Sequence, residues 1–135
     1  MGTLIDSSVF IAAERGHPPS GTMVALADLA TGEYLIAAIT ASELLHGIYR
    51  AKTEEQRLAH TADVENILSN VILIPFDLVV ARVHAQLDAS LRATGNKVGA
   101  NDLAIAATAL THGHDVMTKD LRSFPRVPGL KVLAV

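Results

Sequence analysis

Short apolar runs alternate along the chain with longer stretches in which apolar residues recur at helical spacing. The runs that predict strands are Thr3–Ile5, Tyr34–Ala37, Val71–Ile74, Asp115–Met117 and Lys131–Ala134. The stretches that predict helices are Gly21–Thr31, Ala41–Ala51, Glu54–Ser69, Leu78–Thr94 and Asp102–His112. Strands separated by helices are typical of right-handed crossovers and of a mainly parallel sheet covered on both faces. The pattern therefore predicts an α/β protein, a three-layer α/β/α domain with a mainly parallel five-stranded sheet.

The fourth helical stretch has the clearest boundaries. Its apolar positions recur every three or four residues, and they are Val79, Val80, Val83, Leu87 and Leu91. Asp77 is placed to cap the start of this helix, and Gly95 is placed to end it.

The composition favours a protein built from packed aliphatic side chains. Half of the 135 residues are hydrophobic, only 4% are aromatic, and there is no cysteine. This length predicts a single domain over residues 1–135, and the lack of cysteine excludes disulfides and thiolate metal sites. No apolar run approaches the roughly 18 residues of a membrane span, and no charged and apolar leader stands at the start. We therefore expect a soluble, cytoplasmic protein with no membrane partner.

Two aspartates directly follow predicted strands, Asp6 after the first and Asp120 after the fourth. Ligands of an open parallel sheet bind outside the carboxyl ends of its strands. Asp115 precedes the fourth strand, and four or five extended residues at about 3.3 Å each place it near the opposite edge. Asp6 and Asp120 are thus candidates for chemistry, whereas Asp115 is not.

Helix capping offers a structural explanation for the acids near helix starts. Thr40 with Glu43 matches the capping box S/T-x-x-E, and Asn101 with Asp102 can cap the helix that follows. Asp6 can likewise cap a helix that begins just beyond it. Taken singly, capping is the simpler explanation for each of them.

The acids Asp6, Glu43, Asp102 and Asp120 become more informative as a set. Helices of such a fold commonly start at the edge where strands finish, so the four side chains can converge on one cleft. Four carboxylates in one pocket repel one another unless a cation neutralises them. Oxygen ligands of this kind suit Mg²⁺ or Mn²⁺, which hold phosphates and polarise water. The set therefore predicts phosphoryl chemistry at a metal site.

Four segments of the chain match a known family, in family order and over most of the domain. They are LIDSSVFI, TASELLHGIYRA, NDLAIAATAL and VMTKDLRSFPRVPGLKVL. With them the chain resembles PIN domains, and most closely the VapC-type ribonuclease toxins of toxin–antitoxin pairs. The resemblance implies a sheet order of 3-2-1-4-5, which brings Asp6 next to Asp120. It also implies that the acidic site consists of Asp6, Glu43, Asp102 and Asp120.

What the resemblance implies for chemistry is a Mg²⁺- or Mn²⁺-dependent endoribonuclease. We expect Asp6 and Asp102 to ligate metal, and Asp120 to ligate it directly or through water. Glu43 is expected to orient a metal-bound water. The family's site hydroxyls have candidates in Ser7 and Thr118, which would orient carboxylates or donate to phosphate. The resemblance further implies a homodimer and an inhibitory VapB-like antitoxin as partner.

The net charge of −3 gives no overall attraction to an RNA substrate. Without the four site carboxylates the charge is +1, so the sign of the total does not exclude RNA binding. Cations in segments near the expected cleft are Arg15, Lys97, Lys119, Arg122 and Arg126. Lys119 and Arg122 flank Asp120 and are the best candidates for contacts to backbone phosphates.

Two other functions are compatible with parts of the pattern. A PIN-like domain can bind RNA or protein without cleaving, although the complete set of four acids argues against an inactive module. A phosphatase or receiver domain that forms an aspartyl phosphate fits less well. Such a phosphatase needs a second Asp where Ser8 stands, and Asp77, the candidate phosphoacceptor after the third strand, is better explained as a cap.

Overall fold

The computed structural model describes residues 2–14 and 34–135 of the chain. The strands are β1 (Thr3–Ile5), β2 (Tyr34–Ala37), β3 (Ile72–Ile74), β4 (Asp115–Thr118) and β5 (Val132–Ala134). The helices are α1 (Ser7–Glu14), α3 (Ala38–Tyr49), α4 (Glu54–Asn70), α5 (Leu78–Ala93), α6 (Ala100–His112) and the short 3₁₀ helix η2 (Phe124–Arg126). The predicted helix Gly21–Thr31 and the candidate cation Arg15 lie outside the described residues. Within the described ranges no helix is long and apolar enough to span a membrane.

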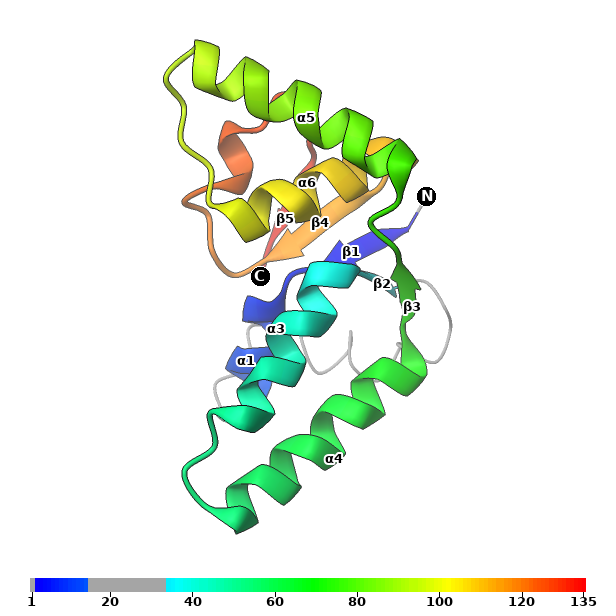
Figure 1. Ribbon diagram of the computed structural model, residues 1–135, viewed down its shortest axis with the longest axis vertical. Coiled ribbons are helices and arrows are strands. Elements are labelled where there is room, and N and C mark those ends of the chain that lie inside the picture. The colour runs from blue at the N-terminus through cyan, green and yellow to red at the C-terminus, as the bar shows by residue number, and fades with distance from the viewer. Residues whose placement is uncertain (1, 15–33) are drawn as a thin grey trace.

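The five strands form one parallel sheet in the order β3-β2-β1-β4-β5, which confirms the predicted order. β1 lies between β2 and β4, and Ile5 is in register with Met117. The ladder continues one residue further, because the Asp6 amide donates to the Met117 carbonyl at 2.9 Å. The residues that follow β1 and β4 therefore emerge side by side at the carboxyl edge of the sheet (Figure 1).

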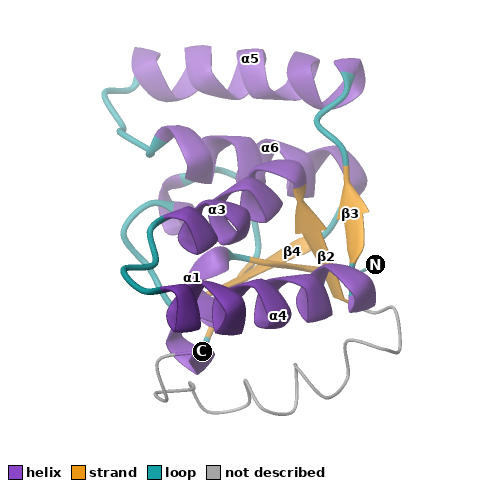
Figure 2. Ribbon diagram, turned by 60° about the horizontal axis from the view of Figure 1, so that its bottom comes forward, coloured by secondary structure: helices purple, strands orange, loops and turns teal. Residues whose placement is uncertain are grey.

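Each face of the sheet carries its own apolar core, as the alternation of side chains along a strand requires. Leu4 belongs to a core with side chains of α5 and α6, and its neighbour Ile5 belongs to a core with side chains of α1, α3 and α4. Figure 2 shows α5 and α6 on one side of the strands and α4 on the other. This arrangement confirms the three-layer architecture and places the starts of α1, α3 and α6 toward the edge that carries Asp6.

Two helices begin earlier than the sequence pattern predicts, and both differences concern the proposed caps. α3 starts at Ala38, directly after β2, with Ala37 at its N-cap position and no side-chain cap. α6 starts at Ala100, with Gly99 at its N-cap and no side-chain cap. The capping box of Thr40 and Glu43 is therefore wrong, as is the cap by Asn101 and Asp102, because these residues already lie inside their helices.

The boundaries of α5 agree closely with the prediction. The Asp77 side chain accepts a hydrogen bond from the Val80 amide at 3.1 Å, which is an N-cap contact. Gly95 follows the helix with a φ of +73°, a left-handed conformation that glycine adopts without a steric penalty.

Replacing Thr40 tests the corrected helix start. Its side chain is fully buried and its Oγ1 has no hydrogen-bond partner among the described residues. We expect Thr40→Val to raise the free energy of unfolding by about 1 kcal/mol, because it removes an unsatisfied buried hydroxyl at nearly constant volume.

Thr53→Val is the matched control, because Thr53 caps α4 by accepting from the Gln56 amide at 3.1 Å. Its loss should cost about 1 kcal/mol. Urea unfolding measures the change in the free energy of unfolding for both variants. If Thr40→Val lowered this free energy, the result would support a capping role for Thr40.

Candidate active site

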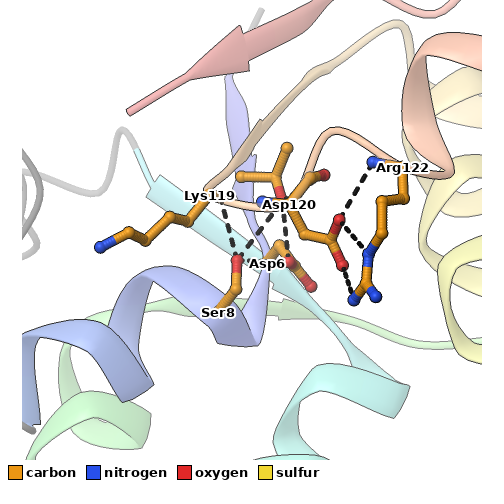
Figure 3. Close-up of polar contacts among 6 residues, drawn as sticks. Asp6, Ser8, Lys119, Asp120 and Arg122 are labelled. Atoms are coloured by element: carbon orange, nitrogen blue, oxygen red, sulfur yellow. Dashed lines mark hydrogen bonds and ion pairs between the residues drawn. The ribbon is translucent and has the colours of Figure 1, made fainter.

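The site is built around Asp6, which is the first residue after β1 and is 5% exposed. Two hydroxyls donate to the same carboxylate oxygen, Asp6 Oδ2: Ser8 Oγ at 2.6 Å and Thr118 Oγ1 at 2.9 Å. Ser8 Oγ in turn accepts from the Lys119 amide at 3.0 Å (Figure 3). These contacts join the start of α1 to the end of β4 and hold the Asp6 carboxylate in one orientation.

Ser8 is a site residue that the sequence interpretation does not include, because it names only Ser7 and Thr118 as site hydroxyls. The structure brings Ser7 beside Glu43, where it acts as a hydrogen-bond partner of that carboxyl group. A signal was present, since a serine two residues after an aspartate can donate back to it where the chain turns into a helix. Thr118 lies against Asp6 at the predicted position.

Glu43 on α3 and Asp102 on α6 both face the Asp6 carboxylate. Burial raises the pKa of Glu43, and the charge of Asp6 raises it further. Asn101 and Ser7 lower it in part by hydrogen bonding. Burial followed by the charge of Asp6 also raises the pKa of Asp102, against a hydrogen bond from Ser123. The fold therefore holds like charges close together, at a cost that a cation at this place would remove.

Asp120 has a different environment, although it lies at the same edge. Arg122 donates to both of its oxygens, from Nε to Oδ1 at 2.9 Å and from Nη2 to Oδ2 at 2.7 Å. The Arg122 amide adds a third hydrogen bond at 3.0 Å. Hydrogen bonding by Arg122 lowers the pKa of Asp120 to about 2. Asp120 is thus a permanently ionised carboxylate with a built-in counterion.

The neighbouring cations point in different directions. In Figure 3 the Lys119 side chain extends away from the Asp120 and Arg122 ion pair. The Arg122 side chain is 88% exposed, so its guanidinium can reach solvent or a ligand. Asp115 lies at the other end of β4, where Lys131 is 3.9 Å away. The opposite-edge placement that the sequence predicts for Asp115 is confirmed.

The donor set suits a divalent cation. Glu43 Oε1 is buried and has no hydrogen-bond partner among the residues that the structure describes, so that this carboxylate oxygen is available to a ligand. The other acids supply hard oxygen donors of the type that Mg²⁺ and Mn²⁺ prefer. Among the residues the structure describes, no three His, Asp or Glu side chains are grouped closely enough to bind one ion directly. Coordination by this set therefore requires side-chain rotation or intervening water, and the ligand roles of the four acids stay a prediction.

Comparison with known proteins assigns the chain to a family. The PIN domain family model matches residues 3–130 of the chain, which is nearly all of it. The chain therefore belongs to the PIN-domain family.

More detailed comparisons narrow the assignment. Ribonuclease VapC1 of Rickettsia felis is 33% identical over 135 residues, and Ribonuclease VapC of Rickettsia bellii is 35% identical over 138 residues. Each match covers 100% of this chain and 97% of the relative. The crystal structure of DNA-bound VapBC from Salmonella typhimurium aligns with a TM-score of 0.85 at 27% identity, over 98% of this chain and 96% of that one. Within the PIN domains, the chain is a member of the VapC ribonucleases.

The pKa shifts predict an unusual pH dependence of stability. A carboxyl group with a raised pKa in the folded state contributes stability below its unfolded pKa, and this contribution is lost as pH rises through the folded value. The metal-free protein should therefore gain stability from Glu43 and Asp102 as pH falls from neutral to about 5. Asp120 adds no slope in this window because its pKa is already near 2.

The measurement is thermal unfolding in EDTA across this pH range, for wild type and Glu43→Gln. His114 opposes the carboxyl groups, because burial lowers its pKa and acidification then destabilises the fold. The informative quantity is thus the difference between the two proteins, in which the His114 contribution cancels. Glu43→Gln should be more stable than wild type at neutral pH, with the gap closing in acid. A gap that is independent of pH would contradict the raised pKa.

Proposed function

We propose that this chain is the toxin of a type II toxin–antitoxin pair and hydrolyses RNA as a Mg²⁺- or Mn²⁺-dependent endoribonuclease. The observation that carries the proposal is the cluster of Asp6, Glu43 and Asp102, in which the charge of Asp6 raises the pKa of both other acids, in a member of the VapC ribonucleases. PIN-domain nucleases generally depend on divalent metal ions.

The acids have separable roles in this proposal. Asp6 and Asp102 would hold the metal ion, with Asp120 acting directly or through water. The ion would supply a water of lowered pKa and stabilise charge on the phosphate. Ser8 and Thr118 fix the Asp6 carboxylate and so reduce the reorganisation needed when a ligand arrives.

Glu43 is the candidate proton acceptor. Its raised pKa brings the carboxyl group closer to the working pH, where a general base is most effective. Its free oxygen, Oε1, has no competing hydrogen bond in the described part of the chain. Glu43 would therefore orient the attacking water and accept its proton.

Arg122 and Lys119 are the candidate phosphate contacts. Arg122 is anchored to Asp120 but largely exposed, so its guanidinium can donate to a phosphate at the rim of the acidic site. Lys119 is exposed at the other side of Asp120. Together they would hold RNA by its backbone, without a requirement for a base.

A VapB-like antitoxin is the proposed protein partner. The Salmonella typhimurium structure that this chain matches is a VapBC complex bound to DNA. By analogy, this chain would be held inactive by a small DNA-binding protein. Its substrate is RNA, so we place its action in the cytoplasm.

A homodimer is supported by an exposed apolar strip on β3 and the start of α5. Its residues and their exposed fractions are Ile72 51%, Leu73 46%, Phe76 44%, Leu78 65% and Val79 58%. β3 is an edge strand, and Ile72 and Leu73 are exposed although successive side chains point to opposite faces. The one acid within the strip, Asp77, is occupied as a helix cap. An apolar edge of this kind, whose one acid is bound to its own helix, is complementary to itself, so we propose a second copy of the chain as its occupant.

Substitution of the aspartates at the two ends of β4 tests the proposed nuclease activity. Asp120→Asn should lower the rate of RNA cleavage in Mg²⁺ by about 100-fold or more, because it removes a carboxylate from the site. Asp115→Asn should cleave like wild type, since its carboxylate lies at the other edge.

The assay is incubation of each folded protein with total RNA in Mg²⁺ and in EDTA. Equal activity in both buffers would exclude the metal mechanism. RNA binding by wild type with no cleavage in Mg²⁺ or Mn²⁺ would instead indicate an inactive RNA-binding module.

The dimer is tested with two leucines of similar exposure. Leu78→Glu should give a monomer in sedimentation velocity, because it places a charge in the centre of the self-complementary strip. Leu58→Glu is the control, since Leu58 is 60% exposed but lies on α4. It should leave the dimer intact, and a wild-type monomer at all concentrations would refute the assembly.

A further inference from the structure

A hollow of about 550 Å³ lies beside the acidic site and has no role in the chemistry described so far. It is bounded by the end of α5, the residues that lead into α6, and Ser123. Its apolar lining includes Leu91 and Leu103, which are buried, and Val98, which packs against the same core. Asn96 adds an amide to the lining. A mostly apolar surface with a few polar groups is suited to one face and edge of a planar ring.

The hollow and the acidic site share a wall. Gly99 lines the hollow, and a Cβ placed on it would lie 3.8 Å from Asp102 Oδ2. Ser123 also lines the hollow, and its side chain is a hydrogen-bond partner of the Asp102 carboxylate. An RNA strand with a phosphate at Asp102 would pass close to the wall that Gly99 and Ser123 form between the two sites.

Arg92 and Lys97 line the hollow, and Arg126 lies outside the lining but is hydrogen-bonded to Lys97, so that the three cations form its rim. Arg92 is neutralised by Asp88, at 3.0 Å. Lys97 and Arg126, by contrast, form no ion pair with any carboxylate in the described ranges. Arg126 Nη1 donates to the Lys97 carbonyl at 3.0 Å, which fixes the guanidinium beside Lys97. Two neighbouring exposed cations that no carboxylate neutralises are suited to bind an external anion.

We propose that this hollow binds the nucleotide next to the cleaved bond, with its base over the apolar lining and its phosphate between Lys97 and Arg126. The proposal rests on the proposed function, since it extends the RNA path from the acidic site by one nucleotide. The ligand class is single-stranded RNA, because a base must be unstacked to enter the hollow.

The test compares two double variants that remove the same charge. Lys97→Gln with Arg126→Gln removes the rim cations. Lys52→Gln with Arg50→Gln removes two exposed cations at the turn between α3 and α4. The RNA substrates are one cleaved oligonucleotide and two truncated forms. Each truncated form ends on one side with the nucleoside directly beyond the scissile phosphate, so that the bond to be cleaved is kept and the phosphate after that nucleoside is absent.

On the long RNA, the rim variant should raise KM by about tenfold, the effect of one lost charge-assisted hydrogen bond, with kcat nearly unchanged. On the truncated RNA that keeps the scissile bond but lacks the phosphate held between Lys97 and Arg126, the rim variant and wild type should have equal KM values. The control variant should match wild type on all three substrates. Thermal unfolding verifies that each protein is folded.

Direct binding supplies a second measurement. In the cleavage-deficient Asp120→Asn background, the rim substitutions should reduce the slope of log affinity against log salt by about 0.7, the value for one neutralised phosphate on a single strand. Fluorescence anisotropy with the labelled long RNA gives this slope.

Failures of the two proposals are distinguishable. If wild type cleaves RNA and the rim variant has an unchanged KM, the hollow is no subsite and the nuclease stands. The same holds if KM rises equally on long and truncated RNA, or if only binding of a protein partner is lost. If wild type cleaves no RNA in either metal, the proposed function itself fails.

Discussion

Repulsion among carboxylates at the carboxyl edge of β1 is the constraint around which this molecule is organised. Asp6 is almost fully buried, and its charge acts on both Glu43 and Asp102. Nothing in the backbone geometry of a parallel sheet requires this cost. It is sustained because Leu4 and Ile5 anchor β1 in the two apolar cores, so the strand cannot shift to relieve the repulsion. The stability of the sheet is thus used to hold a destabilising group of charges in place.

The environment separates the acids into two kinds. Asp120 has a guanidinium bound to both oxygens and a pKa of about 2, so it keeps its charge at any working pH. Glu43 is partly buried with a raised pKa and an unpartnered oxygen. Carboxyl groups whose pKa values are driven apart can serve as fixed charge and as proton acceptor in one site. Arg122 also acts on a third acid, because its positive charge lowers the pKa of Asp102.

Sequence patterns predicted the strands, their order and the edge at which Asp6 and Asp120 meet, because all of these follow from side-chain periodicity and a family resemblance. They did not predict which serine contacts Asp6, because the side chains of the adjacent residues Ser7 and Ser8 point in different directions only once α1 has formed. The Thr40 cap failed for a related reason: β2 enters α3 without a loop, and no residue pattern marks that continuity. The ion pair of Asp120 and Arg122 and the hollow near Gly99 depend on side-chain distances that only the assembled fold defines.

The charge distribution is compatible with the RNA binding that we propose, although the net charge of the chain is −3. Four of its 14 acids lie at one edge of the sheet, and exposed cations lie near that edge: Arg122 on Asp120, Lys119 to one side, and Lys97 with Arg126 across the Gly99 wall. Salt at physiological concentration screens charges beyond about 8 Å, so a phosphate near the rim responds to these cations more than to the total. The centre repels an RNA backbone until a cation neutralises it, whereas the rim attracts it throughout. In the function that we propose, RNA binding and metal binding would therefore be coupled by electrostatics, with each ligand improving the site for the other.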